Sequence, residues 1–98
     1  MDVTLLGSGS ADGWPNPFCR CASCTAQRAA QVHRASTSAL IDDRMLLDLG
    51  PDTVRQATSQ AVDLSDVRWV AVTHAHPDHW SPQALLAYLW TASADRDP

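Results

Sequence analysis

The chain has 98 residues, a formal net charge of −4 and 45% hydrophobic residues, which is enough apolar material for one small globular domain. All its basic residues are arginines and all its acidic residues are aspartates, and this acidic balance argues against a nucleic-acid partner. The longest apolar run, residues 84–90, is far shorter than the ~20 residues that a membrane span needs. With no secretory pattern at its start, the sequence predicts a cytoplasmic protein away from membranes.

Apolar runs separated by turn-forming residues predict a mixed α/β order of elements. Residues 3–6 are the first expected strand, and a loop rich in glycine and proline follows. A helix is expected over residues 25–32, with Ser23 as its cap. The apolar runs 37–41 and 45–49 predict a β-hairpin with a polar turn.

The second half of the chain continues this alternation. A helix is expected from residue 50 to about residue 61, with Pro51 at its start. A strand is expected over residues 68–73, whose centre, residues 69–72, is a continuous apolar run typical of a strand that is covered on both faces. Ser81 and Pro82 predict the start of a last helix, and residues 91–98 are expected to fray. The apolar face of that helix combines Leu85 with Leu89 and Leu86 with Trp90.

Three of the four histidines lie within six residues, directly after the apolar strand, in the segment His74-Ala75-His76-Pro77-Asp78-His79. In an extended segment, His74 and His76 point the same way, whereas Asp78 and His79 follow the proline bend and can face a second position. Imidazole and carboxylate together suit zinc, manganese or iron. We interpret these four side chains as metal ligands; a chance cluster on a polar loop is the alternative.

This His-x-His-x-Asp-His motif after a buried strand resembles the signature of the metallo-β-lactamase fold. The resemblance implies an αββα sandwich, with a mixed sheet and flanking helices, that holds two metal ions. His74 and His76 would bind the first ion and Asp78 and His79 the second, with Asp78 also taking part in catalysis. Asp48-Leu49-Gly50 matches a further family motif, which implies that Asp48 supports the metal loop from outside the coordination sphere. An ordinary turn residue at a strand end is the alternative for Asp48.

The segment Cys19-Arg20-Cys21-Ala22-Ser23-Cys24 holds three thiols, which cannot all pair off in disulfides. Three thiolates can occupy three corners of a tetrahedral zinc site, and three free thiols on a loop are the alternative. With Gly7 and Gly9 upstream, the pattern resembles a metallo-β-lactamase subgroup of phosphoribosyl cyclic phosphodiesterases and pyrroloquinoline-quinone biosynthesis B proteins. There the cysteines hold a structural zinc together with a histidine from the far C-terminus. His33, the remaining histidine here, is expected to be a surface residue at a helix end.

The resemblance implies hydrolysis of a small phosphodiester by a metal-bound hydroxide. It covers the N-terminal half of the family domain, so residues 1–98 are expected to form an incomplete domain, inactive alone and completed by a C-terminal half or a second copy. The inner sheet face, with Leu40, Leu46 and Val70, is expected to be exposed. The alternatives are a non-catalytic metal-binding fragment, a tRNA 3′-processing-nuclease-like enzyme, and a cofactor-biosynthesis or oxidoreductase member of the fold.

Overall fold

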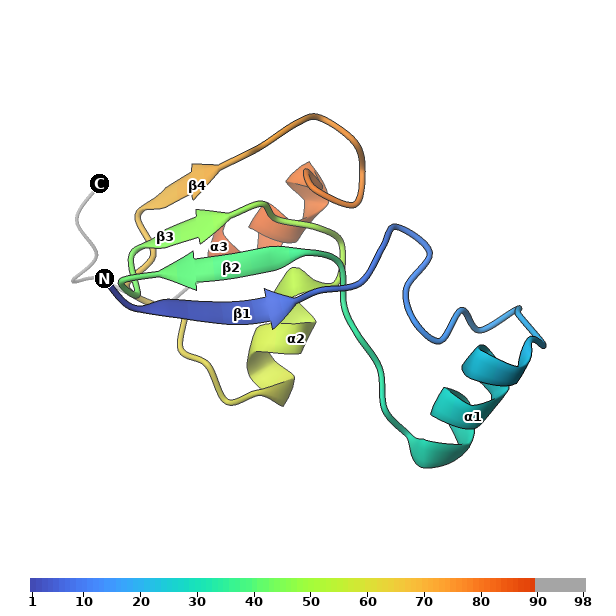
Figure 1. Ribbon diagram of the computed structural model, residues 1–98. Helices are drawn as coiled ribbons and strands as arrows, with labels where there is room; N and C mark the ends of the chain where they lie inside the picture. The colour runs from blue at the N-terminus through green and yellow to red at the C-terminus, as the bar shows by residue number, and fades with distance from the viewer. Residues whose placement is uncertain (90–98) are drawn as a thin grey trace.

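Four strands form one sheet in the computed structural model, which describes residues 1–89 (Figure 1). They are β1 (Val3–Gly7), β2 (Ser38–Ile41), β3 (Met45–Leu47) and β4 (Trp69–Ala71), in that order across the sheet. β2 is antiparallel to both β1 and β3, whereas β4 is parallel to β3. The carboxyl ends of β1, β3 and β4 therefore lie at one edge of the sheet. This mixed sheet with its helices confirms the predicted α/β fold class.

The predicted helices are present, with shifted bounds. They are α1 (Ala22–Ala30), α2 (Thr53–Ser59) and α3 (Leu86–Leu89), and a 3-10 turn over Pro82–Leu85 leads into α3. The prediction of Ser23 as the α1 cap is wrong, because the Cys21 sulfur accepts the Cys24 N–H at 3.3 Å and so starts the helix earlier. Ser81 precedes the 3-10 turn without a side-chain capping bond. The expected frayed tail, residues 91–98, and Trp90 lie outside the described residues.

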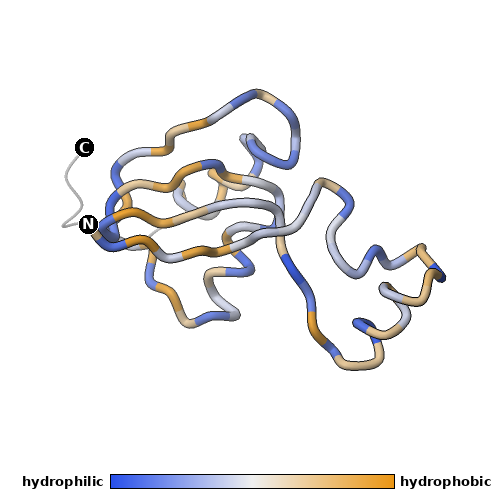
Figure 2. The backbone as a smooth tube through the Cα atoms, viewed as in Figure 1, coloured by the Kyte–Doolittle hydropathy of each residue, from blue (hydrophilic) through white to orange (hydrophobic). Residues whose placement is uncertain are grey.

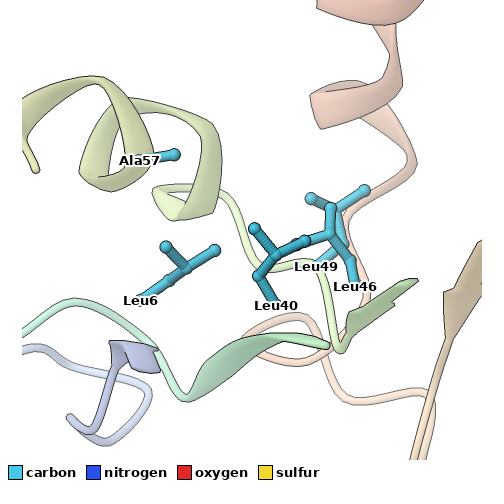
Figure 3. Packing of buried hydrophobic residues seen from close by; sticks show 5 residues of the cluster. All are labelled: Leu6, Leu40, Leu46, Leu49 and Ala57. Atoms are coloured by element: carbon cyan, nitrogen blue, oxygen red, sulfur yellow. The ribbon is translucent and has the colours of Figure 1, made fainter. Parts of the chain in front are cut away.

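The hydrophobic core lies between the sheet and α2, with the 3-10 turn packed beside it. Figure 3 shows its centre, where leucines from the strands and Leu49, just after β3, lie beside the helix that carries Ala57. Leu40 is 1% exposed and Leu46 is 4% exposed, so the expectation that this face would be open is wrong for both. Val70 packs against the same cluster and is half-buried. These residues are covered because the helical segments that follow β3 and β4 fold back over them. The buried members of the cluster are Leu6, Leu40, Leu46, Leu49 and Ala57.

The opposite face of the sheet, which we call the open face, carries apolar side chains on all four strands. Strand register places one row across Val3, Ile41, Met45 and Trp69, and a second row across Leu5, Ala39, Leu47 and Ala71. Val3 is 55% exposed, Leu5 65% and Trp69 58%. Figure 2 shows the apolar colour along the strands. An apolar row that spans a whole sheet is a surface suited to association.

Helix α1 lies apart from the sheet, at the end of an extension formed by the loops on either side of it (Figure 1). The two loops of the extension are joined to each other by backbone bonds, such as that from the Gly9 N–H to the Ala35 carbonyl at 2.7 Å. The Arg34 guanidinium donates to the Ser8 hydroxyl at 3.0 Å and lies 5.6 Å from the centre of the Trp14 ring. Within residues 1–89, no helix combines the length and apolar character needed to cross a membrane.

Candidate metal centre

The histidine loop, residues 72–80, leaves β4 at the carboxyl edge of the sheet and returns along the continuation of β3. Where the loop leaves, the Asp48 N–H donates to the Ala71 carbonyl at 2.7 Å. Where it returns, the Leu49 N–H donates to the His79 carbonyl at 2.8 Å. The two residues that follow β3 therefore hold both ends of the loop, and the predicted ligands between them lie on a fixed base.

The backbone just after β3 makes room for this close approach. Asp48 has a φ of 66°, in the left-handed region that aspartate and asparagine enter more readily than most residues. A Cβ atom on Gly50 would lie 2.5 Å from the Asp78 carbonyl oxygen, so a side chain at residue 50 would push the loop away. The Asp-x-Gly motif thus has a steric role beside the role of its carboxylate.

The Asp48 carboxylate is buried and faces the start and the end of the histidine loop. Its Oδ2 lies 2.7 Å from Nδ1 of His79, and its Oδ1 accepts the Thr73 N–H at 2.7 Å. The Thr73 hydroxyl lies 3.0 Å from both carboxylate oxygens and 3.0 Å from Nδ1 of His74. Because the hydroxyl has a single proton, donation to Asp48 leaves its lone pairs to accept a hydrogen bond from the Nδ1–H of His74. Asp48 therefore orients His79 directly and His74 through Thr73.

Sequence reasoning missed Thr73. It precedes the first histidine of the motif, at a point where the strand has ended, and its backbone N–H and its hydroxyl both bind Asp48. The sequence cue that could have identified Thr73 is a hydroxyl residue between an apolar strand and a polar loop. At such a position a side chain can form a hydrogen bond to the neighbouring strand.

The charges of this cluster follow from its hydrogen bonds. Burial raises the pKa of Asp48, but the bonds from Thr73 and His79 outweigh it and hold that pKa below its usual value. The bond to Asp48 is the main reason why the pKa of His79 is raised, and the Asp78 charge adds to it against the effect of burial. The short bond to the Asp48 carboxylate, which can only accept, requires a proton on Nδ1 of His79. Its Nε2 is directed away from Asp48 and lies 3.2 Å from the Asp78 Oδ2.

Three imidazole rings lie together on the loop. The ring centres of His74 and His76 are 4.6 Å apart, and those of His74 and His79 are 4.0 Å apart. Within residues 1–89, the loop does not bring three donor atoms within 4.8 Å of one another. His74 lies nearer to His79 than to His76, and the Asp78 carboxylate lies 3.2 Å from Nε2 of His79, so the four side chains form one continuous cluster in which the two predicted pairs are not separated.

The cysteines form a second candidate centre on the extension. The sulfur atoms of Cys19, Cys21 and Cys24 all lie within 4.8 Å of one another, close to the separation of about 3.8 Å that tetrahedral zinc with 2.3 Å bonds requires. The trio could therefore hold a metal ion. His33 is not brought to it, because its Nε2 bonds the Gln56 side chain at 2.8 Å.

The three thiols differ in environment. The Cys24 N–H donates to the Cys21 sulfur and is the main cause that lowers the pKa of Cys21 to about 7, with the neighbouring thiols adding to the effect. The Cys24 thiol is buried: a bond from the Asn16 backbone lowers its pKa, but burial and the other two sulfurs together raise it. Cys21 is exposed. A thiolate at this place therefore forms first on the exposed sulfur.

Comparison with known proteins gives a family and two solved relatives. The sequence profile described as the metallo-beta-lactamase superfamily matches residues 33–92. The chain is similar to the Zn²⁺-bound PqqB from Methylobacterium extorquens, with a TM-score of 0.72 and 27% identity, over 88% of this chain and 33% of PqqB. It is also similar to a diphosphatase from the PhnP family, with a TM-score of 0.64 and 31% identity, over 79% of this chain and 30% of that one.

A curated protein is similar over a short part of its length. It is an octanoyltransferase from Porphyromonas gingivalis (strain ATCC BAA-308 / W83), 34% identical over 82 residues, which are 81% of this chain and 16% of the relative. The chain thus spans about a third of the solved structures and a sixth of this curated relative. The comparison of folds rests on the two solved structures. The name octanoyltransferase describes a much longer protein, of which this chain matches a small part.

Proposed function

Since the chain belongs to the metallo-β-lactamase superfamily, we propose that its histidine loop provides the first ligands of a two-metal hydrolase. His74 and His76 would hold one ion, and Asp78 and His79 the other. The observation that carries the proposal is the 2.7 Å bond between Asp48 and Nδ1 of His79. Metal-binding histidines commonly donate their second ring N–H to a carboxylate, which fixes the tautomer and directs the free nitrogen at the metal.

The residues of the loop fit this role in their position and in the bonds that orient their rings. In the neutral ring, the bond from Nδ1 of His79 to Asp48 leaves the lone pair on Nε2, which lies 3.2 Å from a carboxylate oxygen of Asp78. The Thr73 hydroxyl orients His74 in the same way. Two bound divalent ions supply a water of lowered pKa and a clamp for a phosphoryl oxygen. Asp78 would contribute to catalysis by binding its ion and by accepting a proton or hydrogen bond from that water.

We propose a small phosphodiester as the substrate class, acted on in the complete domain. The similarity to a diphosphatase of the PhnP family, at 31% identity, supports phosphoryl chemistry. The higher TM-score of 0.72 to PqqB supports a second candidate function, that of a cofactor-biosynthesis member of the fold. The acidic net charge of −4 favours a small substrate over a nucleic acid.

We also propose that Cys19, Cys21 and Cys24 hold a structural zinc ion, which would tie the loop before α1 to the first turn of that helix. The closeness of their sulfurs supports this. Thiols that bind zinc stay reduced in a cytoplasmic setting, so a cytoplasmic location is part of the same proposal.

Manganese provides the direct test of the histidine loop. Mn²⁺ binds imidazole and carboxylate ligands and binds thiolates weakly, so it should not occupy the cysteine site. The purified chain is titrated with Mn²⁺ and the free ion is followed by electron paramagnetic resonance. We expect a His74→Ala, His76→Ala double variant to lose bound Mn²⁺, whereas the matched control His33→Ala binds as the parent does. Equal Mn²⁺ binding by the parent and the double variant would contradict the proposal.

The substrate class can be tested without turnover. Dimethyl phosphate, a charged diester, is added to the Mn²⁺-loaded chain, and the relaxation of its ³¹P signal is compared with that of the neutral trimethyl phosphate. We expect the diester alone to be relaxed by the bound ion, and neither ester to be relaxed in the double variant. If the diester is not relaxed in the parent chain, the loop does not bring a phosphodiester to the metal.

A further inference from the structure

The first turn of α1 places two of the cysteines in an arrangement that the proposed zinc site does not by itself explain. Cys21 is the N-cap of this nine-residue helix, and its sulfur accepts the Cys24 N–H at 3.3 Å. Its side chain is exposed, whereas Cys24 is buried in the same turn. The pair thus combines an exposed cysteine with a buried one, and their two sulfurs lie no more than 4.8 Å apart.

The spacing favours a bond between these two sulfurs. Residues three apart in the first helical turn lie on the same face, with their Cβ atoms close enough for small side-chain rotations to bring the sulfurs together. Cys19 is placed differently, because it precedes the helix and its sulfur contacts the Cys21 N–H at 3.5 Å. A Cys19–Cys21 bridge would close a ring over two adjacent peptide units and would break the capping contact of Cys21.

We infer that Cys21 and Cys24 form an oxidisable dithiol, which a peroxide or a low-molecular-weight disulfide converts to an intramolecular disulfide. With hydrogen peroxide, the Cys21 sulfur attacks one oxygen, the O–O bond breaks, and a sulfenic acid and one water result. The Cys24 thiol then attacks the Cys21 sulfur, the S–O bond breaks, and the second water leaves. Two electrons pass from the sulfurs to the peroxide, and the two thiol protons leave in the two waters.

The disulfide would change what the extension can bind. It removes two of the three thiolates that could hold a metal, so that oxidation and metal binding at this site exclude each other. The extension would keep its other contacts, among them the bond from the Trp14 indole to the Ser23 hydroxyl at 2.9 Å and the bond from Arg28 to the Asn16 carbonyl at 2.9 Å. The inference needs only the thiols and does not rest on the histidine loop.

Trypsin separates the possible products, because Arg20 lies between Cys19 and Cys21 and Arg28 follows Cys24. The chain is treated with a chelator, desalted, exposed to an equimolar amount of hydrogen peroxide, blocked with N-ethylmaleimide and digested. We expect the peptide 21–28 to be lighter by two hydrogens and to lose both labels, while the peptide 1–20 keeps its label on Cys19. Pre-loading with Zn²⁺ is expected to slow this loss.

Two variants complete the test. In Cys24→Ser, oxidation is expected to stop at a sulfenic acid on Cys21 that dimedone traps, because the sheltered partner is missing. In the matched control Cys19→Ser, the peptide 21–28 is expected to lose both labels as in the parent. A cross-link between the peptides 1–20 and 21–28 would overturn the inference. Full labelling of the peptide 21–28 under conditions that oxidise free cysteine would overturn it as well.

Discussion

Replacing Asp48 by asparagine is expected to weaken Mn²⁺ binding at the histidine loop by about 10–100-fold, the usual effect of losing a carboxylate behind a metal-binding histidine. Asparagine keeps one oxygen, which can still accept the Thr73 N–H that now lies 2.7 Å from Oδ1. The amide nitrogen then faces Nδ1 of His79, and it donates where the carboxylate accepted. The ring proton must therefore move to Nε2, which removes the lone pair that faces Asp78.

The size of the effect follows from this change of tautomer. A 10–100-fold loss corresponds to about 1.4–2.8 kcal/mol, at about 1.4 kcal/mol for each factor of ten. Backbone strain does not contribute, because asparagine tolerates the φ of 66° that residue 48 adopts. The variant also replaces a charge-assisted bond to His79 by a neutral one, which is expected to lower the free energy of unfolding. At roughly 4–8 °C per kcal/mol for a domain of this size, the melting temperature in excess chelator should fall visibly.

The assay is Mn²⁺ titration by electron paramagnetic resonance, at a temperature where circular dichroism shows the variant to be folded. Asp52→Asn is the matched control, because among residues 1–89 the hydrogen bonds of the Asp52 carboxylate come from the Ser36 N–H alone, at 3.2 Å to each oxygen, and an amide oxygen can replace it. Mn²⁺ affinity in folded Asp48→Asn within twofold of the parent would refute the reasoning. An equal loss in Asp52→Asn would show that the effect reports general destabilisation.

Two further predictions concern the extension and the open face. In the chelator-treated chain, alkylation of Cys21 by iodoacetamide is expected to reach half of its maximal rate near pH 7, because the pKa of this thiol is lowered to about 7 and the thiolate is the reacting form. The rate is expected to level off above about pH 8, and a half-maximal rate near pH 9 would contradict this. We expect the chain to self-associate through the open face, where Leu5 is 65% and Trp69 58% exposed. The apparent mass in sedimentation equilibrium should then rise with concentration, and it should rise less in a Leu5→Ser, Trp69→Ser double variant. A Phe18→Ser control changes an apolar side chain that is 93% exposed and lies outside the open face, and an equal effect of this control would argue against the open face as the site of association.

The sequence by itself determined the fold class and the position of the histidine loop. The run of apolar residues before His74 is continuous and the segment after it is polar, so the strand had to end there. The motif is local: four donors within six residues are near one another in any conformation, which is why the histidine loop could be identified without coordinates. The cysteine cluster was recognisable for the same reason.

Only the tertiary structure decided which groups meet across the chain. Asp48 and His79 are 31 residues apart, and they bond because β3 and β4 are parallel neighbours whose carboxyl ends lie at the same edge. The role of Thr73 depends on the same pairing. The sequence also could not predict which face of the sheet is covered, since continuous apolar runs such as Met45–Leu47 do not alternate between apolar and polar residues. Strand register then placed Leu46 inward and Trp69 outward, because adjacent residues of a strand point to opposite faces and the helices cover one of them.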